Sequence, residues 1–428
     1  MKKTILTGLA LLSLSVFAQS PERLVVKLKE GESLPKLSNI IRAQHFFGTT
    51  YVLYTSNAAE LRQEFENMNN TIYIEDEVYA GKRKLPEVEK LPEVEFEKGN
   101  ANPFNDPKVS KIWSFNDRSD YGVSVNQTYR EGASRPVEEV IVAVVDTGVD
   151  YNHEDLKDVM WVNAGEIPGN GIDDDNNGYV DDIHGINTLK RDAQGNATAD
   201  IMDTHSHGTH VSGTIGAKQN NGIGIAGIAS NVKIMGIRTV PNNGDETDID
   251  VAESFLYAAK MGAKLINCSF GKAKNEGGNL VKDTIQHIGE QYGVLVVAAA
   301  GNDGRDIDRR QTWPASYDND NLMVVASTSS SGGMSGFSNY GSKSVDIAAP
   351  GSNIYSTTPR NSYGSMSGTS MACPTAVGVA AEVLANNPNL TPVELKKLLM
   401  DTVTPIGRFS GRLVSAGRID LLKALTGK

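Results

Sequence analysis

Three polar motifs in this chain combine residue types that can perform nucleophilic catalysis. Asp146 follows six apolar residues, His207 lies in the histidine-rich stretch 204–211, and Ser370 follows a Gly-Thr pair. A serine hydroxyl is a weak nucleophile until an imidazole takes its proton, and a carboxylate can hold that imidazole in the required tautomer. Each motif alone is weak, because such turns are common. Their order, aspartate, histidine, serine, is one of the chain orders in which this triad occurs.

Buried parallel strands are predicted to position these motifs. Apolar runs that alternate with helical stretches such as 251–261 and 281–292 lie at 139–145, 233–237, 264–268, 294–299 and 322–326. Continuous apolar runs are typical of parallel strands covered on both faces. We therefore predict an α/β fold, with a mostly parallel sheet and helices on both faces. Functional side chains in such folds gather beyond the carboxyl ends of the strands.

Composition excludes several classes of protein. The 428 residues include 52 acidic and 41 basic side chains, which gives a net charge of −11, and 39% are hydrophobic. This is the balance of an ordinary globular protein, and it argues against a nucleic-acid partner, which would need a basic face. Two cysteines, Cys268 and Cys373, cannot form a disulfide framework. We expect both to be buried free thiols.

The N-terminus has the features of an export signal. Two lysines precede a nearly apolar stretch that ends at Ala18, with Val16 at the −3 position. Residues 1–18 are therefore predicted to be a cleaved signal peptide, and the mature protein to be soluble, secreted or periplasmic, without a membrane partner. A membrane anchor is the alternative, but about 14 apolar residues are short for a span.

A small α+β domain is predicted at 21–80, followed by a linker at 81–104. Strand patterns lie at 23–29, 49–54 and 71–74, and helical patterns at 34–43 and 58–68. The linker carries a duplicated, charged, proline-punctuated stretch from Lys84 to Glu95. We expect this stretch to be solvated, with a domain boundary inside it or just after it.

An acidic loop further along the chain is a candidate calcium site. Oxygen-bearing residues alternate at Asp173, Asp175, Asn177 and Tyr179, with a glycine between the last two. The twelfth position of an EF-hand, usually glutamate, is a histidine here, so Asp182 would have to close the site. Without a cation these carboxylates would repel each other. An acidic surface loop without an ion is the alternative.

Taken together, the motifs resemble the signatures of the subtilisin-like serine peptidases, or subtilases. The matching strings, spread over about 105–425, are Val145–Gly148, His207–Thr214, Ala300–Gly304, Phe337–Gly341, Val345–Gly351 and Gly368–Pro374. This resemblance implies a subtilisin-like peptidase domain at 105–428, in which Asp146, His207 and Ser370 act as the catalytic triad on protein or peptide substrates through an acyl-enzyme.

The resemblance also implies an oxyanion hole and a substrate cleft. The oxyanion would be bound by the side-chain amide of Asn302 and the backbone N–H of Ser370. One wall of the cleft would be Ser269, Phe270 and Gly271, and the other Ala299, Ala300 and Gly301. The small side chains of the second wall favour a large apolar or aromatic substrate residue. Charged residues at 305–309 could bias this preference, and a plain strand end is the alternative for the first wall.

Two further features follow only from the resemblance. A second calcium site would use Asp155, Asn221 and the carbonyls of Ile223 and Ile225, although the loop 219–225 is one residue longer than the usual pattern. The domain at 21–80 would serve as a folding template and transient inhibitor, released by self-cleavage between residues 80 and 105. The protein would then be a monomer made as a zymogen.

Two rival classes of protein make different demands on the same residues. A catalytically silent, calcium-dependent binding protein on this scaffold should lack at least one of Asp146, His207, Asn302 or Ser370, and all four are present. An esterase or lipase of the α/β-hydrolase type should have a Gly-x-Ser-x-Gly elbow and the order serine, acid, histidine. Neither feature appears in the sequence.

Overall fold

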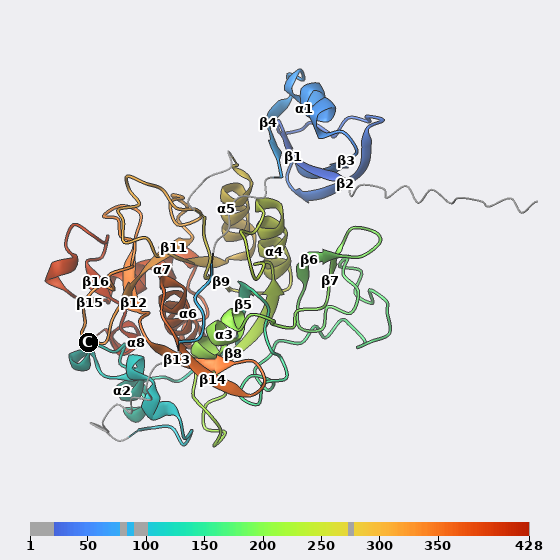
Figure 1. Ribbon diagram of the computed structural model, residues 1–428. Coiled ribbons are helices and arrows are strands. Elements are labelled where there is room, and N and C mark those ends of the chain that lie inside the picture. The colour runs from blue at the N-terminus through green and yellow to red at the C-terminus, as the bar shows by residue number, and fades with distance from the viewer. Residues whose placement is uncertain (1–20, 78–83, 90–101, 273–277, 428) are drawn as a thin grey trace, which may run out of the picture. The chain divides into compact units, whose positions relative to one another are not determined.

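Two compact units make up the chain in the computed structural model, which describes residues 21–77, 84–89, 102–272 and 278–427 (Figure 1). One unit ends at Glu77 and the other begins at Val78. The predicted signal peptide at 1–18 lies outside the described residues. In the part of the chain described, no helix has the length and apolar character needed to cross a membrane.

The first unit is a four-stranded antiparallel sheet in the order β2-β3-β1-β4, with one helix. Its elements are β1 (Glu22–Leu28), β2 (Ile40–Phe47), β3 (Thr50–Thr55), α1 (Ala58–Glu66) and β4 (Thr71–Asp76). Leu61 and Phe65, one helical turn apart on α1, pack against Leu24, Val26 and Leu53 of the sheet. A single apolar stripe on the helix thus closes this small core.

One expected element of this unit is wrong. The helix predicted over 34–43 does not form, because residues 40–47 are β2, paired antiparallel with β3. The apolar residues in this stretch fit either period, and the local sequence could not show that β3 offers an unpaired edge. Tertiary pairing therefore overrides the local pattern.

The second unit is built on a ten-stranded sheet in the order β15-β16-β12-β11-β10-β9-β5-β8-β6-β7. All neighbours are parallel except the outermost pair at each edge. The strands are β5 (Val140–Asp146), β6 (Asn187–Arg191), β7 (Ala197–Thr198), β8 (Val232–Arg238), β9 (Leu265–Cys268), β10 (Leu295–Ala299), β11 (Leu322–Thr328), β12 (Ile347–Pro350), β15 (Thr404–Pro405) and β16 (Gly417–Arg418).

Helices cover both faces of this sheet, as predicted. Val142 and Val144 of β5 share a core with Val211 of α3 and Ala376 of α6, so the alternate residues Ala143 and Val145 face the other side. On that side α4 contacts β5 and packs along α5. The helices are α2 (Val125–Arg130), α3 (His207–Gly216), α4 (Asp248–Lys260), α5 (Leu280–Tyr292), α6 (Thr369–Asn386), α7 (Pro392–Asp401) and α8 (Leu421–Thr426).

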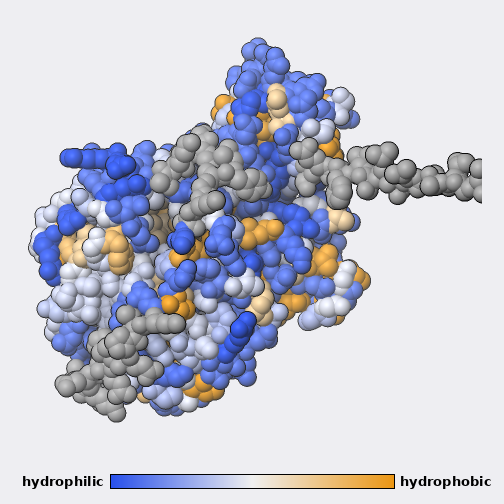
Figure 2. All heavy atoms as spheres, viewed as in Figure 1, coloured by the Kyte–Doolittle hydropathy of each residue, from blue (hydrophilic) through white to orange (hydrophobic). Residues whose placement is uncertain are grey.

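A two-stranded hairpin, β13 (Ile354–Thr358) and β14 (Ser362–Met366), leads into α6. On the face of the molecule shown in Figure 2, apolar residues are interspersed among polar ones. Exposed large apolar side chains in the second unit include Ile167, Ile172 and Val180. Single exposed apolar residues of this kind are ordinary in globular proteins.

The sheet register brings three strand ends to one place. Val145 of β5 and Ala298 of β10 both lie opposite Cys268 of β9. The residues that follow, Asp146, Ser269 and Ala299, therefore emerge side by side at the carboxyl edge of the sheet. Both thiols, Cys268 and Cys373, are buried and free, as expected.

Candidate active site

A buried aspartate and a buried histidine form the first part of the site. Asp146 ends β5 and His207 begins α3, and Nδ1 of His207 lies 2.8 Å from Oδ1 of Asp146. The two side chains are 1% and 0% exposed. A carboxylate can only accept here, so Nδ1 carries the proton and donates it. In the neutral imidazole, Nε2 is then the basic nitrogen.

A second carboxylate, which the sequence analysis missed, shapes the turn before α3. Oδ1 of Asp203 accepts hydrogen bonds from the backbone N–H groups of His205 and Ser206, and Oδ2 accepts from that of Thr209. It also accepts from the hydroxyls of Thr147 and Thr209. Asp203 thus ties the end of β5 to the start of α3 and fixes where His207 begins. An aspartate four residues before the helix start was the available signal.

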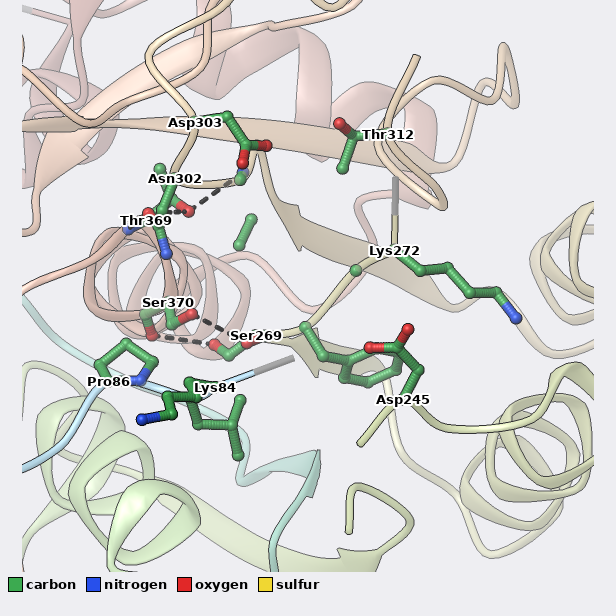
Figure 3. Close-up of a pocket in the computed structure, with 15 residues that line it drawn as sticks. Lys84, Pro86, Asp245, Ser269, Lys272, Asn302, Asp303, Thr312, Thr369 and Ser370 are labelled. Atoms are coloured by element: carbon green, nitrogen blue, oxygen red, sulfur yellow. Dashed lines mark hydrogen bonds between the residues drawn. The ribbon is translucent and has the colours of Figure 1, made fainter. Parts of the chain in front are cut away.

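Ser370 lies on the first turn of α6. Its Oγ donates to the carbonyl of Ser269 at 2.9 Å, and the hydroxyl of Ser269 donates back to the carbonyl of Ser370 at 3.0 Å (Figure 3). This reciprocal pair fastens α6 to the end of β9, next to β5. Among the residues that the structure describes, Nε2 of His207 has no hydrogen-bond partner.

Asn302 and Ser370 both line one cavity at the surface of the second unit (Figure 3). Oδ1 of Asn302 accepts from the backbone N–H of Thr369 at 2.8 Å and from the hydroxyl of Thr369 at 2.9 Å. Both contacts use Oδ1, so the two N–H groups on Nδ2 of Asn302 take no part in them. Nδ2 would lie 3.4 Å from a Cβ on Gly368, two residues before Ser370.

The loop that carries Asn302 is fixed by a residue to which the sequence analysis gave no role. Asn339 accepts from the backbone N–H groups of Asp303 and Arg305, and its Nδ2 donates to the carbonyl of Ala300. A Cβ on Gly301, whose φ is +97°, would lie 2.5 Å from that Nδ2. Only glycine is therefore compatible with both the backbone conformation and the space at 301.

A cavity of about 450 Å³ lies in front of Ser370 and Asn302. Most of the residues predicted for the cleft line it: Ser269, Phe270, Gly271, Ala299 and Gly301. Ala300 is fully buried, and its N–H donates to Val325 behind the wall. The charged residues at the cavity are partly compensated, since Lys272 pairs with Asp248 at 2.8 Å and Asp303 with Arg305 at 3.4 Å.

Burial decides the ionisation of three neighbouring groups. Burial lowers the pKa of His210, one turn below His207, to about 3, and its Nε2 lies 2.8 Å from the carbonyl of Ile354. Burial also lowers the pKa of His205, with a further contribution from His207. Burial raises the pKa of the Cys373 thiol to about 12. At neutral pH His210 is therefore an uncharged structural residue and Cys373 is not a thiolate.

Carboxylates converge in the acidic loop, although not in the expected combination. Ligand oxygens of Glu166, Asp173 and Asp175 lie within 4.8 Å of one another, which suits the oxygen donors that calcium prefers. Glu166 was missed because it lies outside the alternating motif. Asp182 turns inward, where it accepts from the hydroxyl of Tyr257 at 2.5 Å. Asn177 donates to both Asp175 and Asp182, and the hydroxyl of Tyr179 donates to Glu253.

At the second suggested calcium site, hydrogen-bond donors surround the carboxylate. Oδ1 of Asp155 accepts from Nδ2 of Asn221, and Oδ2 accepts from the N–H of Ile225 and the hydroxyl of Tyr363. The N–H of Ile223 donates to Oδ1 of Asn221. Burial raises the pKa of Asp155. Both oxygens of Asp155 therefore have hydrogen-bond donors in this structure, and calcium at this second site stays a prediction.

The fold and the site together define a class of protein. A mostly parallel α/β sheet carries, at its carboxyl edge, a buried Asp-His pair, a serine at a helix start and an asparagine amide beside it. This is the set of groups expected of a hydrolase that uses a serine nucleophile.

Comparison with known proteins identifies the family. Residues 138–417 match the model of the subtilase family, so the chain belongs to that family. It is 34% identical over 307 residues to subtilisin-like protease 1 of Plasmodium berghei, covering 68% of this chain and 50% of that protein. It is 35% identical over 285 residues to a thermophilic serine proteinase of Bacillus sp. strain AK1, covering 67% and 61%.

A third relative extends over most of the chain. The halolysin-like extracellular serine protease Nep of Natrialba magadii is 31% identical over 395 residues, which cover 92% of this chain and 63% of that protein. The chain spans about half the length of the Plasmodium relatives that it matches.

Proposed function

We propose that this protein is a secreted serine endopeptidase, made as a zymogen that cleaves itself. The observation that carries the proposal is the 2.8 Å contact between Nδ1 of His207 and Asp146, which leaves Nε2 free as a base at the edge where Ser370 enters. The family and the extracellular protease of Natrialba magadii support the same conclusion.

In the proposed mechanism, Ser370 attacks a substrate carbonyl while Nε2 of His207 takes its proton. The hydroxyl must first leave the carbonyl of Ser269, to which it donates in this structure, by rotation about its Cα–Cβ bond. His207 then returns the proton to the leaving amine, and an acyl-enzyme remains on Ser370. Asp146 stabilises the imidazolium and keeps the proton on Nδ1. In the second half of the reaction, water takes the place of the amine. His207 removes a proton from the water, which attacks the acyl carbonyl, and then returns the proton to Ser370 as the acid leaves.

The negative charge that develops on the substrate oxygen needs donors already in place. The amide of Asn302 and the backbone N–H of Ser370, at the start of α6, can supply them. Asn302 needs no rearrangement for this role, because Thr369 already holds its oxygen. Preorganisation of this kind is what makes such donors effective.

Calcium would have a structural part in this enzyme. Glu166, Asp173 and Asp175 would hold it, and its charge would offset their mutual repulsion. We further propose that the first unit is the pro-domain, that residues 1–18 direct export, and that the enzyme is a monomer acting on protein or peptide substrates.

The nucleophile is the part of the proposal that can be tested directly. After self-cleavage, a fluorophosphonate should label the protein at one serine, and a chromogenic peptide should be hydrolysed. Ser370→Ala should abolish labelling and lower turnover by several orders of magnitude, because the acyl-enzyme cannot form. Ser410→Ala, at an exposed serine, is the matched control. A chain that folds and sheds its pro-domain but is not labelled would contradict the proposal.

A further inference from the structure

A short stretch of the second unit passes in front of Ser370. Residues 84–89 have the sequence Lys-Leu-Pro-Glu-Val-Glu. Lys84, Leu85 and Pro86 line the same cavity as Ser370 (Figure 3), and Leu85 is only 6% exposed. The composition predicted a solvated linker here, yet this part of it lies in the cleft.

A backbone contact fixes how this stretch, the cleft segment, is aligned. The N–H of Glu89 donates to the carbonyl of Ser365 on β14 at 2.8 Å, as part of an antiparallel bridge. In antiparallel pairing, each step forward on one strand is a step back on the other. Pro86 therefore lies opposite Gly368. A Cβ on Gly368 would be 3.1 Å from Cγ of Pro86, which agrees with that register.

Two glycines give the cleft segment the room it occupies. Gly368 receives the ring of Pro86, and Gly364 receives Val88. A Cβ on Gly364 would lie 2.6 Å from Cγ1 of Val88, whereas the next residue, Thr358, is at an ordinary 3.7 Å. A methyl group at 364 would therefore force Val88, which is 43% exposed, to shift, whereas its other neighbours would tolerate it.

We propose that the cleft recognises the sequence Leu-Pro-Glu-Val-Glu, and that the cleft segment is its built-in ligand. The proline is selected by the space over Gly368 and the valine by the space over Gly364. This inference rests on the proposed function, because it assigns a preferred peptide class to the same cleft. The protein substrates favoured on this side of Ser370 then carry proline followed, two residues later, by a β-branched residue.

The sequence supplies an internal reference for testing this. Residues 90–95 repeat Lys-Leu-Pro-Glu-Val-Glu, so the bonds Glu87–Val88 and Glu93–Val94 lie in the same local sequence. The full chain with Ser370→Ala, which cannot cut itself, would be treated with a glutamate-specific endopeptidase and followed by mass spectrometry. Binding should slow cutting at Glu87–Val88 at least about tenfold relative to Glu93–Val94. Equal rates would overturn the proposal.

Variants on both sides of the contact sharpen the test. Gly364→Ala should reduce the difference in rate to within about twofold. Val88→Gly removes the methyl group that the new Cβ at 364 would meet, so adding it to Gly364→Ala should restore the difference in cutting rate. Val94→Gly is added at the same time, so that the two compared bonds keep the same local sequence. If the difference survives Gly364→Ala in a chain with the parent's melting temperature, or is not restored, the proposal fails. If Gly364→Ala does not fold, Pro86→Gly combined with the matching change Pro92→Gly should also lower the protection of Glu87–Val88.

The active chain separates this inference from the proposed function. Added peptide Leu-Pro-Glu-Val-Glu should compete with a chromogenic substrate, and Leu-Pro-Glu-Trp-Glu should compete at least about tenfold more weakly. Labelling and turnover without such competition would overturn the inference alone. Protection of Glu87–Val88 in the Ser370→Ala chain, together with a processed wild-type protein that a fluorophosphonate never labels, would overturn the proposed function alone.

Discussion

At the scale of single residues, the site depends on side chains that are held by one end and act with the other. Asn302 is bound through its oxygen to Thr369, which leaves its amide for the proposed oxyanion hole. His207 is bound through Nδ1 to Asp146, which leaves Nε2 for the proposed role of base. In both cases the fixed end removes the freedom that would otherwise have to be lost during the reaction.

Replacing Asn302 tests the oxyanion hole. Asn302→Ala should lower kcat by about 10² to 10³, the range found for such a donor in subtilisin, because the lost hydrogen bond forms in the transition state. KM should change little. Steady-state turnover of a chromogenic peptide checks this. Thr369→Ser, which keeps the hydroxyl that binds Oδ1, is the control and should stay close to the parent. A rise in KM with unchanged kcat would instead assign Asn302 to ground-state binding.

His210 should make the protein sensitive to acid. Its pKa is lowered from 6.5 to about 3, so between these values the unfolded chain binds a proton that the folded chain does not. The free energy of unfolding therefore falls as the pH falls through this window, by at most about 1.4 kcal/mol per pH unit from this residue. His210→Gln keeps a side-chain N–H for the carbonyl of Ile354 and cannot be protonated.

The measurement is thermal unfolding of the Ser370→Ala chain between about pH 6.5 and about pH 4.5. The chain that retains His210 should lose more stability over this range than the chain that also carries His210→Gln. The same substitution at His45, which is exposed in the first unit, is the control. Parallel losses with and without His210 would show that other groups set the acid sensitivity.

At the scale of elements, the start of α3 is the joint on which the site depends. Three backbone N–H groups and two hydroxyls converge on the buried carboxylate of Asp203. This joint connects the end of β5, with Asp146, to the helix that begins at His207. The distance between Asp146 and His207 is therefore controlled by a residue that need not contact a substrate.

Removing the Asp203 carboxylate should damage both stability and activity. Asp203→Ala leaves several buried donors without an acceptor, at a cost of at least about 2 kcal/mol. Denaturant unfolding measures the loss, and fluorophosphonate labelling should slow because His207 is no longer held. Asp200→Ala is the control: it is exposed, 3.7 Å from Lys190, and should change stability by less than about 0.5 kcal/mol. Equal effects of the two variants would deny Asp203 this role.

At the scale of the whole molecule, long loops that leave the sheet need contacts of their own to keep one conformation. The segment between β5 and β6 forms turns and no regular strand or helix, and it contains the carboxylates of Glu166, Asp173 and Asp175. Side chains such as Asn177 and backbone N–H groups offset some of this negative charge. A divalent cation would offset more of it.

Calcium should therefore stabilise the second unit. Saturation to about 100 times the Kd would contribute about 2.7 kcal/mol, so a chelator should lower the melting temperature of the Ser370→Ala chain. Glu166→Gln should weaken the response to calcium, whereas Asp158→Asn, at an exposed carboxylate, should not. Titration followed by calorimetry distinguishes these cases. A melting temperature that is indifferent to calcium in the parent chain would contradict the assignment.

The sequence by itself determined the five central strands of the large sheet, β5, β8, β9, β10 and β11, and the polar motifs of the site. Runs such as 140–145 are apolar on both faces, which only a covered parallel strand requires, and the polar residue that ends each run is then placed at one edge. Asp146, His207 and Ser370 could be found because their residue types, order and local turns are all local information.

Only the tertiary structure decided which distant groups complete these motifs. The pairing of β2 carries no local pattern of its own, because its partner β3 must be in place, and Glu166 lies outside the alternating acidic motif that it joins. The placement of residues 84–89 in the cleft depends on space over Gly364 and Gly368, which lie far along the chain. Local periodicity reports which face of an element is buried, and it contains no information about what lies opposite.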